Sequence, residues 1–416
     1  MPNKKTVVIT SHPVTQFGFA RVSRPIIDML IDTFGYTNEN LLILDTSKIR
    51  ELPTHYREIR VVSMTSNGTI AQIMPSVVSD YQPKLVICFG DIWDHFHIYN
   101  LKKSLGFDLV YYANVESEHI PQKLAIDSGA LMFHEEYKKV DHLLAYSKFG
   151  AIELAKVVEH DVPYIYHFVD HGIFHPLEGF DRKSVFKSVP SDAFIVSTVA
   201  VNGFRKSLDM ICAGFAEFLT RLSPVERAKT YLYLHTNMTG TVGWDIKELT
   251  DMFGISNNVL LNHGISQYGK FVTDEELNKI YNASDVFINL SRGEGFGLGL
   301  IEACAVGCRI VFLDYATPSE TMKDEDGRVP VAIREVRPNN VTNFSALPDP
   351  KVVGQKLADI RHQKYRIKGR YSKVVSANIE LAKKFDRVPI MAEWEKFLRP
   401  IVEKQPPKVS IGIQRL

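Results

Sequence analysis

The sequence lacks several features that would set it apart from ordinary globular proteins. It has four cysteines in 416 residues, too few and in too apolar a setting for a disulfide framework. No apolar run approaches the roughly 18 residues of a membrane-spanning helix. Acidic and basic residues balance to a net charge of +1, so no charge excess favours binding to nucleic acid or an anionic membrane.

The sequence also shows no secretory signal and no repeat. The first apolar stretch, Thr6 to Thr10, is too short for the apolar core of a signal peptide. No internal repeat at solenoid period and no low-complexity tract is present. We therefore expect a cytoplasmic protein with reduced thiols. Cys304 and Cys308 stand one helical turn apart, but no partner follows at metal-ligand spacing, which favours buried thiols.

What is present is a regular alternation of apolar strand-like runs and helical segments. Such runs predict parallel sheets covered on both faces. A turn-rich stretch near residue 180 separates two series of similar size. We predict an α/β protein of two doubly wound domains, residues 1–180 and 181–388. The expected strands are residues 7–10, 41–44, 85–89, 109–112, 143–146 and 164–168, then 194–199, 231–235, 259–262, 286–290 and 310–314.

The later part of the chain is expected to be less regular. The polar, proline-bearing residues 337–350 predict a surface loop. Two helices are expected after it, over residues 376–385 and 389–403, with Pro389 breaking them. The last helix has an apolar stripe that includes Trp394.

The most informative stretch is SRGEGFGLGLIEACAVG, residues 291–307. Alternating glycines follow a predicted strand and open a predicted helix, where free N–H groups and the helix dipole favour a phosphate. Glu294 lies in the turn, and Glu302 lies inside the helix with seven residues between them. Two carboxylates beside a phosphate site suit a nucleotide sugar, which has ribose hydroxyls at one end and sugar hydroxyls at the other.

A dinucleotide-binding fingerprint is the alternative interpretation of these glycines. Their spacing, G-x-G-x-G, differs from G-x-G-x-x-G, and the turn lies late in the chain. The whole string instead resembles the E-x7-E motif of retaining GT-B glycosyltransferases (glycosyltransferase group 1), in the form EGFGL…EA.A.G. The matching residues are Glu294, Gly295, Phe296, Gly297, Leu298, Glu302, Ala303, Ala305 and Gly307, and Glu320 matches a glutamate that usually follows.

The resemblance implies two Rossmann-like domains facing a central cleft, with residues 389–416 crossing back to the N-terminal domain. It also implies roles for single residues. Lys206 would hold the donor diphosphate, with Arg205 beside it; the family's usual arginine stands about where Asn202 lies. Glu294 would orient the donor sugar, while Glu302 would bind the ribose. Gly295, Phe296, Gly297 and Leu298 would complete the donor site.

Residues of the N-terminal half are assigned to the remaining parts of the ligands. Gly18 opens a predicted helix and would let a diphosphate approach. Glu116 resembles the acidic residue of the family's acceptor loop, and His119 is a second candidate, although an exposed loop histidine is an equal alternative. The cluster Asp91, Asp94, His95 and His97 is interpreted as polarity around the acceptor rather than a metal site, since histidines at i and i+2 do not share a helix face. Asp324 to Asp326 resembles a D-x-D metal motif, but we predict that it forms a charged, solvent-exposed turn.

We therefore predict a metal-independent enzyme without a cofactor, which moves a hexose from a nucleoside diphosphate sugar to an acceptor hydroxyl. The expected partners are this donor and a carbohydrate or glycan acceptor, with no nucleic acid; peripheral contact with a membrane stays open. General resemblance to mannosyltransferases favours GDP-mannose over UDP-glucose. The alternatives are a sugar-nucleotide epimerase and a non-catalytic nucleotide-sugar-binding protein on the same fold.

Overall fold

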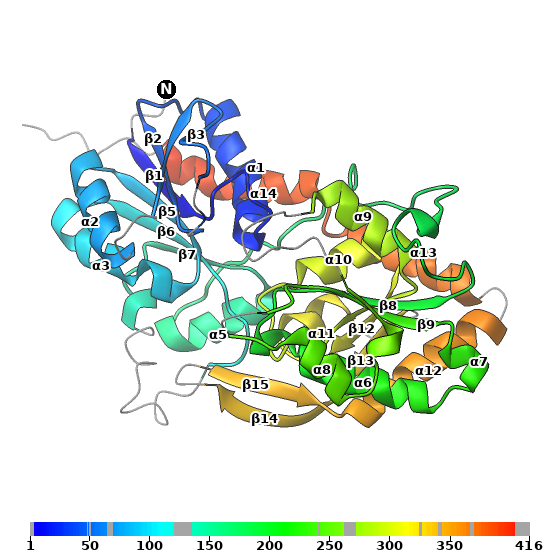
Figure 1. Cartoon of the computed structure of the whole chain (residues 1–416). Coiled ribbons are helices and arrows are strands. Elements are labelled where there is room, and N and C mark those ends of the chain that lie inside the picture. Colours follow the sequence, from blue (N-terminus) through cyan, green and yellow to red (C-terminus); the bar gives the residue numbers. More distant parts are fainter. Residues whose placement is uncertain are drawn as a thin grey trace, which may run out of the picture. The chain divides into compact units, whose positions relative to one another are not determined.

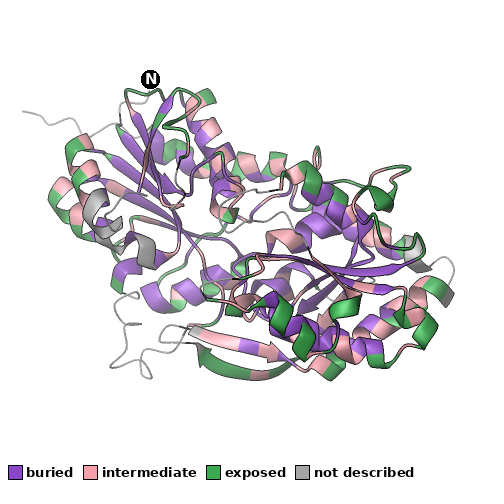
Figure 2. Cartoon of the chain, viewed as in Figure 1, coloured by how far each residue is buried: buried purple, intermediate pink, exposed green. Residues whose placement is uncertain are grey.

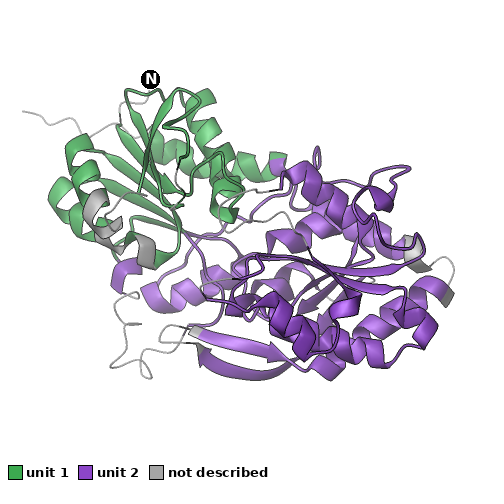
Figure 3. Cartoon of the chain, viewed as in Figure 1, with its two compact units in different colours: residues 1–112, 139–143, 388–416 green, residues 113–138, 144–387 purple. Residues whose placement is uncertain are grey.

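The chain is described here by a computed structural model (Figure 1). It describes residues 4–47, 49, 51–64, 70–119, 135–239, 242–261, 272–323, 327–339, 343–366 and 370–403. The chain divides into two compact units (Figure 3). Unit 1 comprises residues 1–112, 139–143 and 388–416, and unit 2 comprises residues 113–138 and 144–387. The two domains expected from the sequence, divided near residue 180, stay a prediction.

Unit 1 is built around a seven-stranded sheet of order β3-β4-β2-β1-β5-β6-β7. β1 pairs in parallel with β2 and β5, and β2 pairs in parallel with β4, whereas β3 and β4 are antiparallel. The strands are β1 (Thr6–Thr10), β2 (Leu41–Asp45), β3 (His55–Tyr56), β4 (Ile59–Ser63), β5 (Leu85–Gly90), β6 (Asp108–Ala113) and β7 (His142–Ala145). The helices are α1 (Gly18–Asp32), α2 (Ile70–Tyr81), α3 (Ile92–Leu105) and α14 (Arg387–Val402).

The C-terminal helix α14 packs into unit 1 through its apolar stripe. Trp394 is fully buried, and its ring lies 4.8 Å from that of Tyr112 and 6.0 Å from that of Phe89, measured between centroids. Aromatic pairs at such separations and tilts are favourable beyond the area that they bury. Pro389 lies in the first turn of α14, where a missing N–H costs little. The preceding helix ends at Lys383, so the expected break between two helices is present.

Unit 2 is built around a six-stranded sheet of order β10-β9-β8-β11-β12-β13, with every neighbouring pair parallel. Its strands are β8 (Phe194–Val199), β9 (Thr230–His235), β10 (Val259–Leu261), β11 (Val286–Asn289), β12 (Arg309–Leu313) and β13 (Arg328–Val331). Most of their residues are buried (Figure 2), as expected where helices cover both faces of a parallel sheet. Such burial explains why these strands are apolar runs rather than alternating ones.

Helices lie on both faces of this sheet (Figure 1). One face packs against α6 (Leu208–Thr220), α8 (Ile246–Met252) and α12 (Pro350–Arg366), whose apolar residues share one buried cluster with the strands. On the other face lie α9 (Asp274–Ala283), α10 (Leu298–Ala305) and α13 (Arg370–Lys383). The remaining helices of unit 2 are α5 (Lys148–Val158), α7 (Pro224–Arg227) and α11 (Thr317–Thr321), with the short 3₁₀ turns η2 (Arg182–Ser184), η3 (Phe204–Lys206) and η4 (Ser256–Asn258).

Two sequence predictions are wrong. Residues 337–350 are not a loop: β14 (Ile333–Asn339) and β15 (Asn343–Pro348) form an antiparallel hairpin. Prolines in a two-stranded ribbon lie on edge strands, which tolerate them, so proline content did not exclude strands there. Residues 164–168 are not a strand, because within the described chain they form only a single bridge, between Tyr164 and Ala145. α13 also begins at Arg370 rather than at residue 376.

Candidate functional site

The glycine-rich segment leads from β11 into α10 of unit 2, as the sequence predicted. Gly297 is the N-cap of α10 and has a φ of +87°, a conformation that glycine adopts without strain. At Gly295, an added Cβ would lie 1.9 Å from Oδ1 of Asn114. The segment therefore needs glycine both to begin the helix and to pack closely against residues 114–117, which belong to the same unit.

Four charged side chains meet at this segment. Nζ of Lys206 donates to both carboxylate oxygens of Glu294 at 2.8 Å. Nη1 of Arg205 donates to Glu294 at 2.5 Å, and its Nη2 lies 2.9 Å from Oε1 of Glu116. Glu116 is in turn held by the side-chain amide of Asn114 at 3.2 Å. The structure thus brings together Glu294, Lys206, Arg205 and Glu116.

Burial and charge together set the protonation of this cluster. Burial alone would raise the pKa of Glu294, but the Lys206 and Arg205 cations outweigh it and lower the pKa to about 2. Burial, followed by repulsion from Arg205, lowers the pKa of Lys206, against the opposing pull of Glu294. Glu294 is therefore an ionised carboxylate at neutral pH, and its charge keeps two cations beside the N-terminus of α10.

Glu302 lies in α10 and is almost completely buried. Its Oε2 accepts a hydrogen bond from the hydroxyl of Tyr281 in α9 at 2.9 Å. This bond ties the Glu302 carboxylate of α10 to a second helix, α9. Leu298, partly buried, is the first residue of α10. Phe296 is 3% exposed, and its ring packs against Tyr166, His167 and Phe385.

Asn202 lies at the end of β8 and is buried. Its amide nitrogen donates to the backbone carbonyls of Asn237 and Trp244 at 3.0 and 2.6 Å, and its oxygen accepts from the Trp244 N–H at 2.9 Å. These three bonds hold the chain that follows β9. The predicted substrate contact of Asn202 would have to share its amide with them.

The remaining predicted residues lie in two places. Gly18 is the first residue of α1 in unit 1, and an added Cβ there would meet nothing within 4 Å. In unit 2, the backbone N–H of His119 donates to Glu153 at 3.2 Å, and its ring lies 6.2 Å from that of Tyr137. The roles assigned to both residues stay predictions.

Glu320 makes a set of contacts that the sequence did not specify. It lies in α11 and accepts from the backbone N–H groups of Lys148 and Phe149 at 3.1 and 2.6 Å, and from the hydroxyl of Tyr166. Beside it, the Thr317 hydroxyl lies 2.8 Å from that of Ser147 and donates to the carbonyl of Gly295 at 3.0 Å. Glu320 thus satisfies free donors at the start of α5, next to the glycine-rich segment.

Sequence reasoning also missed Arg292 and Asn114. Both lie next to predicted residues, and their polar character inside otherwise glycine-rich or apolar stretches was the only available signal. Cys304 and Cys308, which the sequence predicts to be buried thiols, are buried and free of disulfides. His95 is buried, with Nε2 3.2 Å from the carbonyl oxygen of Phe89, and burial lowers its pKa to about 4. Residues 324–326 lie outside the described chain.

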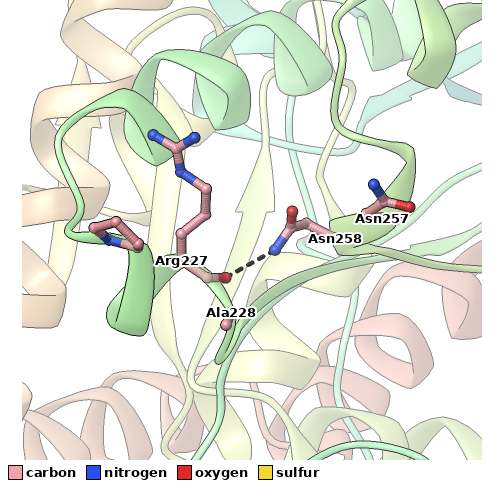
Figure 4. Close-up of a pocket in the computed structure, with 5 residues that line it drawn as sticks. Arg227, Ala228, Asn257 and Asn258 are labelled. Carbon is pink, nitrogen blue, oxygen red and sulfur yellow. Dashed lines mark hydrogen bonds between the residues drawn. The ribbon is translucent and has the colours of Figure 1, made fainter.

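No group of three or more potential metal ligands gathers anywhere in the described part of the chain. A pocket of about 330 Å³ is lined by Pro224, Arg227, Ala228, Asn257 and Asn258 (Figure 4). In it, the amide of Asn258 donates to the carbonyl of Arg227 at 2.8 Å. It shares no residue with the charged cluster.

Among the described helices, none has both the length and the apolar character needed to cross a bilayer.

Comparisons with known proteins agree with the fold. The family model described as glycosyl transferases group 1 matches residues 242–336, which include Glu294 and Glu302. Putative glycosyltransferase 41 of Sulfolobus islandicus filamentous virus (isolate Iceland/Hveragerdi) is 36% identical over 72 residues. That alignment spans 17% of this chain and 22% of the viral protein.

Solved structures resemble nearly the whole chain. Sucrose-phosphate synthase from Thermosynechococcus elongatus has a TM-score of 0.72 at 15% identity, covering 95% of this chain and 98% of that one. Alr3699/HepE of Anabaena in complex with UDP and glucose has a TM-score of 0.68 at 14% identity, covering 95% and 100%. The predicted α/β fold class is confirmed. The chain has the GT-B fold, and its residues 242–336 are similar to the glycosyl transferases of group 1.

Proposed function

We propose that this protein is a retaining glycosyltransferase that moves a hexose from a nucleoside diphosphate sugar to an acceptor hydroxyl, without a metal. The observation that carries the proposal is the Glu294 carboxylate held between Lys206 and Arg205 at the glycine-rich N-terminus of α10. Cations and free helix N–H groups at one place suit a diphosphate. The similarity of residues 242–336 to group 1 glycosyl transferases supports the same reaction class.

In this proposal the two cations act on the leaving group. As the bond from the sugar to the diphosphate breaks, negative charge grows on the diphosphate, and cations already in place lower that barrier. Lys206 has three N–H donors, of which Glu294 takes two. The diphosphate would take over part of this bonding, which would leave Glu294 to accept from the hydroxyls of the donor sugar.

The other predicted residues would serve the rest of the two substrates. Glu302, held by Tyr281, would accept from the ribose hydroxyls, and Gly18 would admit the diphosphate. Glu116 and His119 would face the acceptor. We also propose that residues 1–180, with residues 389–416, bind the acceptor and that residues 181–388 bind the donor. A positive charge supplied by Lys206 and Arg205 replaces the one that a metal would otherwise supply.

The donor is proposed to be a hexose nucleotide, with GDP-mannose favoured by sequence resemblance. Three structures of the Anabaena protein hold UDP, with or without glucose, or UDP-glucose, so UDP-glucose is the necessary comparison. Thermal shift against GDP- and UDP-sugars would rank them, since a ligand at 100 times its dissociation constant adds about 2.7 kcal/mol of stability.

The test of the reaction is product analysis with the best donor, alone and with a panel of sugar acceptors, in the presence and absence of EDTA. We expect a new glycoside that keeps the donor's anomeric configuration, formed equally with EDTA. Conversion of the donor without an acceptor would instead indicate an epimerase, and binding without turnover a non-catalytic module. Lys206→Ala should slow transfer by on the order of 10²-fold or more, while Lys229→Ala, which removes an exposed ion pair with Asp192, should leave it unchanged.

A further inference from the structure

Arg292 lies two residues before Glu294 and contacts the turn that carries both cations. Its backbone N–H donates to the carbonyl of Arg205 at 2.8 Å. Its side chain reaches past that turn: Nε donates to Oγ of Ser207 at 3.3 Å, and Nη2 donates to Oδ2 of Asp209 at 3.0 Å. One residue of the glycine-rich segment is thus bonded to positions on both sides of Lys206.

The turn that Arg292 contacts is strained. Ser207 joins η3 to α6 with a φ of +52°, a left-handed conformation that is unfavourable for a residue other than glycine. Strained residues persist where their surroundings over-determine them. Ser207 makes no capping hydrogen bond to α6 with its side chain; instead its hydroxyl accepts from Arg292. The conformation of Ser207 sets the angle at which the turn that carries Arg205 and Lys206 joins α6.

Asp209 supplies the charge that holds Arg292 in place. Both side chains are largely shielded from solvent, with 24% of Arg292 and 11% of Asp209 exposed. A partly buried, charge-assisted bond of this kind is stronger than a neutral one. On the other side, the carbonyl of Arg292 accepts from the N–H of Ala346 in β15 at 2.9 Å. Arg292 is therefore fixed from α6 and from the hairpin β14–β15.

We propose that Arg292 is a positioning residue that keeps Arg205 and Lys206 in register with Glu294. This rests on the proposed function, because the register is the one that a leaving diphosphate would need. Arg292 bonds to the backbone of Arg205 and to the side chain of Ser207, and it acts on the charged cluster through them. Misplacing a catalytic group by about 1 Å can cost about 10²-fold in rate.

The experiment compares Arg292→Gln and Arg292→Lys with Arg361→Gln, in full-length protein. Arg361 is a matched control because it forms a similar, part-buried ion pair with Glu226 in the same unit at 2.8 Å, away from the charged cluster. Three quantities are measured for each variant: kcat and donor KM, the affinity for UDP and GDP by calorimetry, and the urea midpoint of unfolding.

We expect Arg292→Gln to lower kcat by on the order of 10²-fold and to weaken nucleoside diphosphate binding, with a smaller change in donor KM. Arg292→Lys should recover part of kcat, because its ammonium still faces Asp209 but does not also reach Ser207. Arg361→Gln should lower the unfolding midpoint and leave kcat and diphosphate affinity at wild-type values. Equal kcat in Arg292→Gln and Arg361→Gln would overturn the inference.

Ser207→Gly keeps the test decisive if Arg292→Gln does not fold. Glycine accepts the positive φ without strain, so this variant should unfold at no lower urea concentration than wild type. It also removes the hydroxyl that Arg292 holds, and we expect kcat to fall several-fold; wild-type kcat would count against the inference. If the wild type neither transfers a sugar nor binds UDP or GDP, the proposed function fails and this inference with it, whereas active wild type with unimpaired variants overturns the inference alone.

Discussion

Both carboxylate oxygens of Glu294 lie 2.8 Å from Nζ of Lys206. The Glu294 carboxylate is therefore an anion beside the lysine that we assign to the donor diphosphate. Because the two residues come from the turn after β8 and the turn after β11, their pairing joins the ends of two adjacent strands. Substitutions of residues at this pair, and of residues that support it, give distinct and measurable outcomes.

Truncation of Lys206 and of Glu302 should change different kinetic constants. Lys206→Ala removes a cation facing charge that grows in the transition state, so kcat should fall by on the order of 10²-fold or more. Glu302→Ala removes bonds to ribose hydroxyls that are equal in ground and transition states, so mainly KM should rise. Steady-state kinetics on both variants measures the difference.

Tyr281→Phe is the control for Glu302→Ala. It removes the hydroxyl that donates to Glu302 but keeps the carboxylate for the donor, so its effect on KM should be the smaller one. The assignment along the donor would be wrong if Lys206→Ala changed only KM while Glu302→Ala abolished kcat.

The alkaline limb of kcat/KM should report Lys206. Burial and the neighbouring Arg205 lower the pKa of Lys206, so the cation should be lost at a pH below the ordinary lysine value of about 10.4. The kcat/KM profile reports the free enzyme. In Lys206→Arg the limb should move to higher pH, because a guanidinium keeps its proton. A limb at the same pH in both proteins would assign it to another group.

Stability in acid should report Glu294. Its pKa is lowered to about 2, so its contribution is complete above its ordinary pKa of about 4.3 and is lost as the pH falls toward 2. The difference in urea midpoint between wild type and Glu294→Gln should therefore shrink from pH 5 to pH 3. A difference that stays constant over this interval would contradict the ion pairs described above.

Glu320→Ala should destabilise unit 2. The substitution leaves two N–H groups at the start of α5 and the Tyr166 hydroxyl without their carboxylate acceptor. Leaving such donors unsatisfied costs about 1–3 kcal/mol. Urea unfolding measures the loss. Glu380→Ala, at an exposed pair with Lys383, should stay within about 0.5 kcal/mol of wild type; equal effects would mean that the cap contributes nothing.

Gly295 and Gly18 should differ sharply in their tolerance of alanine. A Cβ at Gly295 would lie 1.9 Å from Oδ1 of Asn114, whereas one at Gly18 would meet nothing within 4 Å. Gly295→Ala should therefore lower the unfolding midpoint and activity together. Gly18→Ala should fold normally and raise donor KM if a diphosphate approaches there. Asn114→Ala should relieve part of the Gly295→Ala defect, and the absence of any relief would locate the clash elsewhere.

Much of the fold was predictable because parallel strands covered on both faces are continuous apolar runs. Val286 to Leu290 and Phe194 to Val199 are examples. The hairpin β14–β15 was not predictable in this way, since Ile333 and Val336 are exposed among charged residues. The strand predicted over residues 164–168 is absent for the opposite reason: an apolar run there is not part of a sheet. Within this stretch, the rings of Tyr166 and His167 pack against Phe296 instead of contributing to a sheet.

The site was predictable where a residue lies in the glycine-rich motif. Glu294 and Lys206 meet, although 88 residues apart in sequence, because both follow the ends of adjacent parallel strands. The contacts of Arg292 and Glu320 depend on how distant loops pack. No local pattern indicates that an acidic side chain in α11 caps α5, or that one arginine spans Ser207 and Asp209.

The bonding of Asn202 restricts how this sequence can change over time. A side chain at Gly243 would begin 2.2 Å from Oδ1 of Asn202, and the amide already serves three backbone groups. An arginine at position 202 would leave those groups without their amide partner, and a larger residue at position 243 would collide with the asparagine. The two positions are therefore expected to covary, and an arginine at position 202 is not reached by a single tolerated substitution. In this chain, Arg205 rather than a residue at position 202 is the arginine that shares Glu294 with Lys206.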